Sequence, residues 1–335
     1  MATQREIRRR MGSIRNIRQI TRAMELIAVT RLRRAQQRVL ASRPYADKMR
    51  QVLGDLVEQV EQVEPGGAPG AGEPAVAGPP DVNRQANREA DHPPAEAEGA
   101  EVTALHPLLD RRPVRRVGVL LLTTDRGLCG ALNSNTIRTA LQYAYGQQNQ
   151  GRAVEFVVVG RKGLQATSRL PVTVTAEFTA LGDYPSLTRI APIVRVVMDA
   201  FTSQALDEVV LVYPRFVSTL RQDPSVVPLL PIQPPEEAEE ETRGARAGEV
   251  DYIYEPDPRS VLAELLPRFV EVQVYQAVLE MIASEFSARM VAMRNATDNA
   301  GELLDDLQLG FNKARQATIT REIIEVSAGA NTQQR

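Results

Sequence analysis

The sequence predicts an α/β domain between two long terminal helices, which pair with each other as an antiparallel coiled coil. Apolar residues recur at steps of three and four near both ends of the chain, as on one face of a helix. Short apolar runs alternate with helical patterns in the middle, as in a layered α/β domain. Two acidic, proline-containing segments separate these parts. We therefore divide the chain into residues 1–63, 64–113, 114–232, 233–258 and 259–335.

The first part is expected to form one helix over residues 3–60. Its apolar seam runs from Ile7 to Val39, and no proline precedes Pro44. Arginines occupy the other faces, so residues 1–50 carry 14 basic and 3 acidic side chains. A helix this basic has the charge to bind the phosphates of a nucleic acid, an anionic membrane or an acidic protein surface. The continuous seam favours a helix partner, and a basic coiled-coil protein that binds nucleic acid is the main alternative.

The two separating segments are predicted to be solvated loops. Residues 64–113 hold 9 prolines and 6 glycines and no aromatic residue, which predicts a flexible insert. Residues 233–258 carry 9 acidic and 2 basic side chains and are interpreted as an acidic linker. These acidic segments offset the basic first helix, so the formal net charge of −2 describes no single surface.

The middle part alternates between strand and helix patterns. Strands are expected at 117–123, 154–160, 172–178, 208–213 and 226–232. Helices are expected at 133–147, 161–169 and 187–204.

The last part is predicted to begin with a short helix that breaks near Pro267, because the ring clashes with the preceding turn. No proline follows, and apolar or small residues recur from Phe269 to Ala317. A single helix of this length needs a partner seam, and the first helix supplies one. Since the domain between them returns the chain, the pairing is antiparallel. The C-terminal helix is the longer one, so its last turns should project beyond the coiled coil, with a tip held by another protein.

Composition excludes several kinds of site. Cys129 is the only cysteine, so the chain has no internal disulfide and no thiolate metal cage. His92 and His106 both lie in the proline-rich segment, which argues against a histidine metal or general-base site. There is no run of about 18 apolar residues and no apolar stretch of a secretory signal. We expect a soluble protein of the cytoplasmic type.

The loop after the first predicted strand, TTDRGLCGALN at residues 123–133, is the main candidate for chemistry. Glycines between a strand and a helix can form an anion-binding nest. However, the loop lacks both the Gly-Lys-Ser/Thr ending of a P-loop and the three-glycine dinucleotide fingerprint. A structural turn is therefore favoured over an enzyme site, with Asn133 or Ser134 as the helix N-cap. Cys129 is interpreted as a packed side chain.

Three long stretches resemble the γ subunits of rotary F-type ATP synthases. They are REIRRRMGSIRNIRQITRAMELIAVTRLRRAQ near the N-terminus, the TTDRGLCGALN loop, and residues 284–329. The resemblance implies a Rossmann-like central domain at the foot of an asymmetric coiled coil. The inserts within 64–104 and 233–250 look longer than the family usually carries. The chain also lacks the cysteine pair of the redox-controlled relatives.

The resemblance also implies a function. The coiled coil would be the rotor inside the α/β hexamer, with its foot on the c-ring beside the ε subunit, one copy per complex. Rotation driven by proton flow would push the β subunits through states that form and release ATP. Catalysis would take place in the hexamer, so this chain would need no cofactor or metal. Nucleic acid would not be among its partners. It would lie peripherally at the cytoplasmic face of a bacterial plasma membrane.

The resemblance assigns roles to individual residues. Rotor contacts to β and α are implied for Met24, Arg289, Arg315, Gln316, Thr320, Glu322 and Glu325. A bearing tip held in the collar of the ring is implied for Ile323, Ile324 and Val326. A place at the foot, near ε and the c-ring, is implied for Tyr213, Arg215 and Phe216. A structural family loop is implied for Asp125, Arg126, Gly127, Cys129 and Gly130.

Overall fold

The computed structural model describes residues 4–63, 106–233, 254, 255 and 257–333. The side chains of residues 58–63, Glu325 and 327–333 also lie outside the described part. Most of the two expected inserts, at 64–105 and 234–253, falls outside it as well, so their predicted character stays a prediction.

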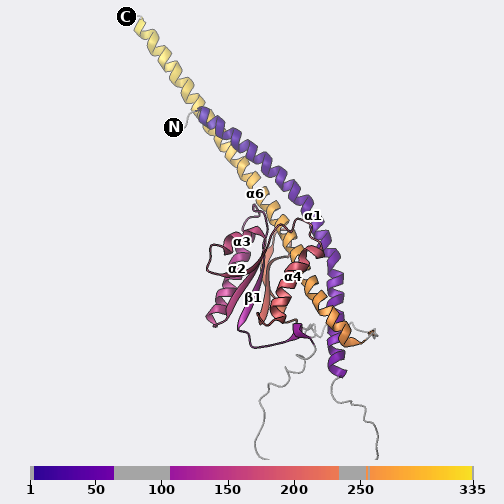
Figure 1. The fold of residues 1–335 in the computed structure, drawn as a ribbon. Helices are drawn as coiled ribbons and strands as arrows, with labels where there is room; N and C mark the ends of the chain where they lie inside the picture. The colour runs from indigo at the N-terminus through magenta and orange to yellow at the C-terminus, as the bar shows by residue number, and fades with distance from the viewer. Residues whose placement is uncertain (1–3, 64–105, 234–253, 256, 334–335) are drawn as a thin grey trace, which may run out of the picture.

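Two long helices form the antiparallel coiled coil. Helix α1 spans Gln4–Val63 and helix α6 spans Pro258–Gln333. Three contacts fix their opposite directions. The guanidinium of Arg8 lies 5.4 Å from the ring centre of Phe311, and the hydroxyls of Thr21 and Thr297 are 2.8 Å apart. The guanidinium of Arg31 lies 5.8 Å from the ring of Phe286. The end of α6 projects past the start of α1, as predicted (Figure 1).

The coiled coil is packed most tightly in its lower half, beside the α/β domain (Figure 1). Leu53 and Leu56 of α1 and Leu266 and Val270 of α6 are all fully buried in one apolar core. This packing explains why the predicted break at Pro267 is wrong, since α6 runs through it without interruption. A proline inside a helix costs about 3 kcal/mol, and burial of the side chains around it offsets that cost.

The central domain is built on one five-stranded sheet. Its strands are β1 (Arg116–Leu122), β2 (Ala153–Val159), β3 (Thr173–Phe178), β4 (Glu208–Phe216) and β5 (Gln222–Leu230). The strand order is β3-β2-β1-β4-β5. The first three pairings are parallel, and β5 is antiparallel to β4. All five expected strands are present, with shifts of a few residues at their ends.

Helices cover both faces of this sheet. Helix α2 (Leu132–Asn149) packs on one face, where Ala140 and Ala144 meet apolar side chains of β1, β2 and β4. Helix α4 (Leu187–Thr202) and α6 pack on the other face, and their core continues into the coiled coil. The short helix α3 (Arg161–Thr167) follows β2. The predicted fold class, an α/β domain joined to long antiparallel helices, is confirmed.

The structure corrects the end of the expected flexible insert. Residues 107–109 form a 3-10 turn, η2 (Pro107–Leu109), and Leu108 and Leu109 are buried. Ile232 donates a backbone hydrogen bond to the Leu108 carbonyl at 2.9 Å, and the His106 imidazole caps the turn. Composition alone placed these residues in the insert because prolines surround them, but two adjacent leucines suffice to anchor them on the core.

Candidate functional sites: the family loop, the domain junction and the helix tip

Within the described residues, no group of His, Cys, Asp and Glu gathers that could hold a metal ion. Among the described helices, none combines the length and apolar character needed to cross a membrane. The candidate sites are therefore the 123–133 loop, the contacts that join the α/β domain to the coiled coil, and the exposed end of α6.

The 123–133 loop is held by side chains from its own ends. The Asn133 side-chain carbonyl accepts from the Thr124 amide at 3.1 Å. The Asn133 amide group donates to Thr124 Oγ1 at 2.8 Å and to Cys129 Sγ at 3.2 Å. The expected N-cap role is therefore wrong: Ala131 occupies that position and makes no side-chain cap hydrogen bond. Asn133 lies in the first turn of α2 and faces back into the loop.

The first amides of α3, the helix that follows the neighbouring strand β2, are satisfied within the chain. The Arg161 amide donates to Asp125 Oδ1 at 3.1 Å, and the Gly163 amide donates to Thr123 Oγ1 at 2.8 Å. The Lys162 amide donates to the Thr124 carbonyl at 3.1 Å. These amides are already engaged, so the start of α3 offers no donors to a phosphate. The geometry supports the structural interpretation of the loop.

Gly160 shows how closely the ends of β1 and β2 approach. Its φ of +94° suits glycine, and a Cβ placed there would lie 2.1 Å from the Thr123 carbonyl oxygen. Any larger residue would push the two strand ends apart.

Cys129 is a packed residue, as expected. It is buried, and burial raises the pKa of its thiol, with the nearby Glu285 carboxylate acting in the same direction and Arg289 against it. A thiol with a raised pKa forms less of the reactive thiolate.

Arg289 is turned toward its own chain. Its guanidinium donates to Glu285 Oε1 at 2.5 Å and to the Gly127 carbonyl at 3.0 Å. The two charged side chains are only 10% and 12% exposed. This burial argues against the predicted contact with another subunit. The spacing of four residues on one helix was a sequence signal for the pair, but the loop carbonyl was not visible in the sequence.

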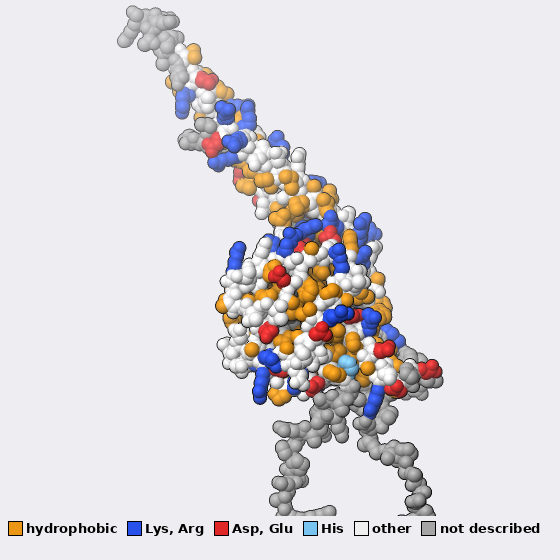
Figure 2. Space-filling model, viewed as in Figure 1, with side chains coloured by type: hydrophobic (Ala, Val, Ile, Leu, Met, Phe, Trp, Pro, Cys, Tyr) orange, Lys and Arg blue, Asp and Glu red, His pale blue; other side chains and the backbone are white. Residues whose placement is uncertain are grey.

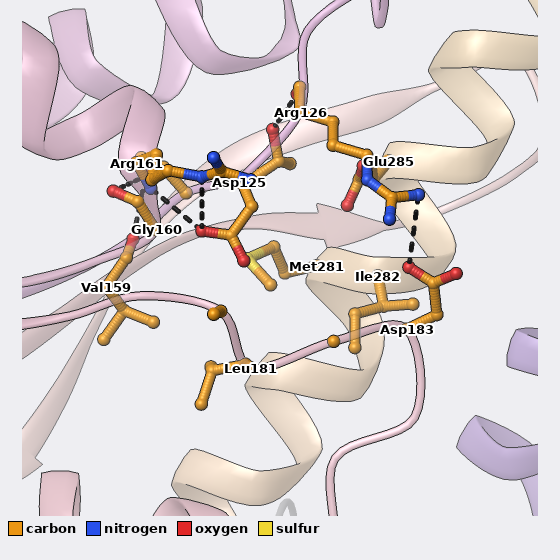
Figure 3. Close-up of a pocket in the computed structure, with 14 residues that line it drawn as sticks. Asp125, Arg126, Val159, Gly160, Arg161, Leu181, Asp183, Met281, Ile282 and Glu285 are labelled. Carbon is orange, nitrogen blue, oxygen red and sulfur yellow. Dashed lines mark hydrogen bonds and ion pairs between the residues drawn. The ribbon is translucent and has the colours of Figure 1, made fainter.

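A cleft of about 170 Å³ lies between this loop, the loop after β3 and α6 (Figure 3). Its charged side chains face one another across the opening. Arg126 lies 4.0 Å from Asp183, and Arg161 lies 3.8 Å from Asp125. Because these opposite charges are paired with each other, the cleft offers no surplus charge to a ligand.

The expected foot residues lie at the end of β4, within the α/β domain. Tyr213 is buried, its hydroxyl is hydrogen-bonded to Glu280, and burial raises the pKa of that hydroxyl. The neighbouring Pro214 carbonyl accepts from Ser284 of α6 at 2.9 Å. Arg215 is exposed and Phe216 is half-buried. This part of β4 therefore contacts the middle of α6, and its contacts with ε and the c-ring stay predictions.

The end of α6 projects beyond the start of α1 at Gln4 (Figure 1). We call residues 315–326 the tip. Arg315, Gln316, Thr320 and Glu322 are exposed there. Its apolar side chains are exposed as well, by 46% at Ile319, 63% at Ile323, 61% at Ile324 and 74% at Val326. Met24, on α1, is half-buried, and the Glu325 side chain lies outside the described residues. Their contacts with other subunits stay predictions.

Comparison with known proteins identifies the family. A family model described as ATP synthase matches residues 3–332. The ATP synthase gamma chain of Roseiflexus castenholzii is 44% identical over 331 residues, which cover 98% of each chain. The chain belongs to the ATP synthase gamma chain family. The gamma chain of Acidithiobacillus ferrooxidans is 43% identical over 330 residues, covering 98% of this chain and 99% of the relative.

Solved structures share the family fold. A chain of the Euglena gracilis mitochondrial ATP synthase is 17% identical with a TM-score of 0.59, covering 98% of this chain and 94% of that chain. A chain of the Tetrahymena thermophila central stalk and c-ring structure is 19% identical with a TM-score of 0.54, covering 83% and 99%. None of these comparisons supports the nucleic-acid alternative. As a gamma chain family member, the protein is a subunit of the ATP synthase complex.

The match to the Roseiflexus gamma chains spans 98% of this chain and therefore extends across both long inserts.

Proposed function

We propose that this chain is the rotating central shaft of ATP synthase, with its tip inside a ring of α and β subunits. The observation that carries the proposal is the tip itself. It is a single helix with four large, strongly exposed apolar side chains in a stretch that projects beyond its partner helix. At a rise of about 1.5 Å per residue, residues 315–333 extend roughly 28 Å. A helix of this kind needs surrounding protein to cover it.

The asymmetry of the chain provides the mechanism. A lone tip, a two-helix segment and a domain on one side give the shaft different surfaces in different directions (Figure 1). As the shaft turns, identical β subunits meet different surfaces in succession. A rotor can change the relative free energies of their conformations only through such differential contacts. Binding of ADP and phosphate, ATP formation and release then take place in the hexamer, so this chain itself is not catalytic and needs no cofactor.

Two sets of tip residues have separate tasks in this proposal. Arg315, Gln316, Thr320, Glu322 and Glu325 make polar contacts with β loops, together with Met24 on α1. Ile323, Ile324 and Val326 form the apolar bearing held by the collar of the ring. The exposed arginines of α1 then face acidic surfaces of the ring, for which the planar guanidinium is well suited (Figure 2).

The remaining partners meet the α/β domain. We place the ε subunit and the c-ring there, with one shaft per complex and no nucleic acid. The Euglena structure is of an assembly with F1 and the c-ring, and the Tetrahymena structure is of a central stalk with the c-ring. Given bacterial relatives, the complex would sit at the cytoplasmic face of the plasma membrane.

Reconstitution with α and β subunits tests the proposal. A bead attached to the α/β domain should rotate on addition of ATP. A ring that assembles and hydrolyses ATP while the bead stays stationary would overturn the mechanism. Salt-sensitive binding of DNA or RNA by the isolated chain would instead favour the basic coiled-coil alternative.

A further inference from the structure

We infer that Glu285 and Asp183 are positioning residues that clamp the α/β domain to the two helices of the coiled coil, so that the domain cannot twist about it. The clamps stand on the contacts within the chain. Only their use in passing torque rests on the proposed rotor function.

The first clamp joins the 123–133 loop to α6. Glu285 Oε1 holds the Arg289 guanidinium at 2.5 Å, and the same guanidinium nitrogen donates to the Gly127 carbonyl at 3.0 Å. Both side chains are almost fully buried. A buried guanidinium needs a carboxylate partner, and that partner also restricts its orientation. Glu285 therefore acts on the loop through Arg289.

The second clamp joins the loop after β3 to α1. Asp183 Oδ2 accepts from the Arg31 guanidinium of α1. Its other oxygen lies 4.0 Å from Arg126 in the 123–133 loop, and Figure 3 shows the two side chains pointing toward each other. One carboxylate thus connects α1 with two loops at the same edge of the sheet.

The two clamps lie at the same level of the coiled coil. Phe286, which is 2% exposed, has the Arg31 guanidinium 5.8 Å and the Arg289 guanidinium 5.7 Å from its ring centre. A domain attached at one point can turn about that point. A domain attached to two helices at one level resists such turning.

Much of the remaining domain contact is apolar, since side chains of α4 and β4 pack against α6 in one continuous core. Neutral hydrogen bonds from Ser284 and Ser287 of α6 to the Pro214 and Thr219 carbonyls add to it. Burial of apolar area is not directional, so it opposes separation more than sliding. Hydrogen bonds weaken steeply when their angle changes, and charge-assisted ones are the strongest. The charged clamps are therefore the parts of this contact best suited to carrying torque.

Amide hydrogen exchange on the full chain tests the clamps without any rotation. Glu285→Gln should speed exchange of the Thr124 and Leu132 amides, which are hydrogen-bonded within the loop, by about tenfold or more, since it weakens a charge-assisted bond to the loop. The matched control is Glu271→Gln, which removes a carboxylate of the same helix whose ion pair among the described residues, with Arg268, lies within α6. Equal exchange in both variants would overturn the inference. If Glu285→Gln fails to fold, Asp183→Asn is tested in the same way, with the Arg161 and Lys162 amides, which are hydrogen-bonded to the 123–133 loop, as the reporter.

The role of the clamps in passing torque is tested in the reconstituted complex. A bead is attached through Thr173→Cys, an exposed position at the start of β3, and its angular fluctuations are recorded in the stalled complex. Glu285→Gln and Asp183→Asn should each widen the fluctuations, and the double variant should widen them further, while Glu271→Gln should not. A bead that rotates on ATP but fluctuates equally in all variants would overturn the torque role and leave the rotor function intact. If the bead on the chain with intact clamps does not rotate, that result counts against the rotor function. The amide hydrogen exchange experiment then still tests the clamps by itself.

Discussion

Two parts of α6 use charged and apolar side chains in opposite ways. At the junction with the α/β domain, Glu285 and Arg289 are buried and bonded to each other, and Phe286 is enclosed between arginines. At the tip, Arg315 and Ile323 are both exposed. The difference shows which surface is complete within the chain and which needs a partner. The junction stabilises the chain itself, whereas the tip acquires its contacts only in a complex.

The largest effect is expected from removing the aromatic ring at the junction. Phe286→Ala should lower the free energy of unfolding by about 3–5 kcal/mol, because it leaves a cavity between both helices. Ile324→Ala at the tip should change it by less than about 0.5 kcal/mol, because that side chain is already exposed. Denaturant unfolding of the isolated chain measures both. Similar losses in the two variants would remove the distinction between junction and tip.

In the assembled complex, substitutions at the tip should have a large effect, and the quantity affected is binding to the α and β subunits. Ile323→Ser combined with Ile324→Ser should weaken binding to the α and β subunits by roughly 1.5–3 kcal/mol for each side chain that the ring buries. The isolated chain should keep its stability. Leu220→Ser, at an exposed leucine after β4, is the control and should not affect assembly with α and β. Unchanged binding of the double variant would show that the ring does not cover the tip.

A smaller effect is expected at the polar part of the tip. Changing Arg315 and Gln316 together to Ala should weaken assembly or coupled turnover by about 1 kcal/mol, since exposed polar contacts contribute little each. ATP hydrolysis and synthesis by the reconstituted complex measure this change. Full activity would show that these contacts are dispensable.

The smallest effect concerns the pH dependence of stability near the junction. Glu280 lies among Tyr213 and Arg215 of β4 and Arg43 of α1, and burial raises its pKa above the ordinary 4.5 despite Arg43. The folded chain therefore binds this proton more tightly than the unfolded chain does. Stability from this group is greatest below pH 4.5 and falls as pH rises through the folded pKa. Glu280→Gln should flatten that fall in unfolding measured from acidic to neutral pH, and an unchanged slope would contradict the assignment.

Much of the fold follows from local patterns. The seam from Ile7 to Val39 predicted α1, and short apolar runs predicted all five strands, because each pattern shows which face a segment must bury. The break at Pro267 was wrong because a local cost was outweighed by burial that depends on α1 and the domain. Asn133 was assigned as a cap because its residue type favours one, but the loop before it provided nearer partners.

The site residues divide in the same way. The exposed tip was predicted from the unequal lengths of the two helices, and the structure places it beyond the start of α1. Arg289 was expected to face another subunit, and Tyr213 to lie near ε and the c-ring. Within the chain both side chains are buried, because loops and strands distant in sequence reach the middle of α6. Their contacts with other subunits stay predictions.

Periodicity along the chain was enough to determine the helices, the strands and the pairing of the two termini, because each amphipathic segment has one apolar face to bury. It could not determine what a given charged side chain contacts. Arg289 and Arg315 lie on one helix and carry the same charge, but only Arg289 meets a loop carbonyl. That contact depends on where the sheet places residue 127 in space. The tertiary structure therefore decided which arginine forms bonds within the chain and which stays exposed to a partner subunit.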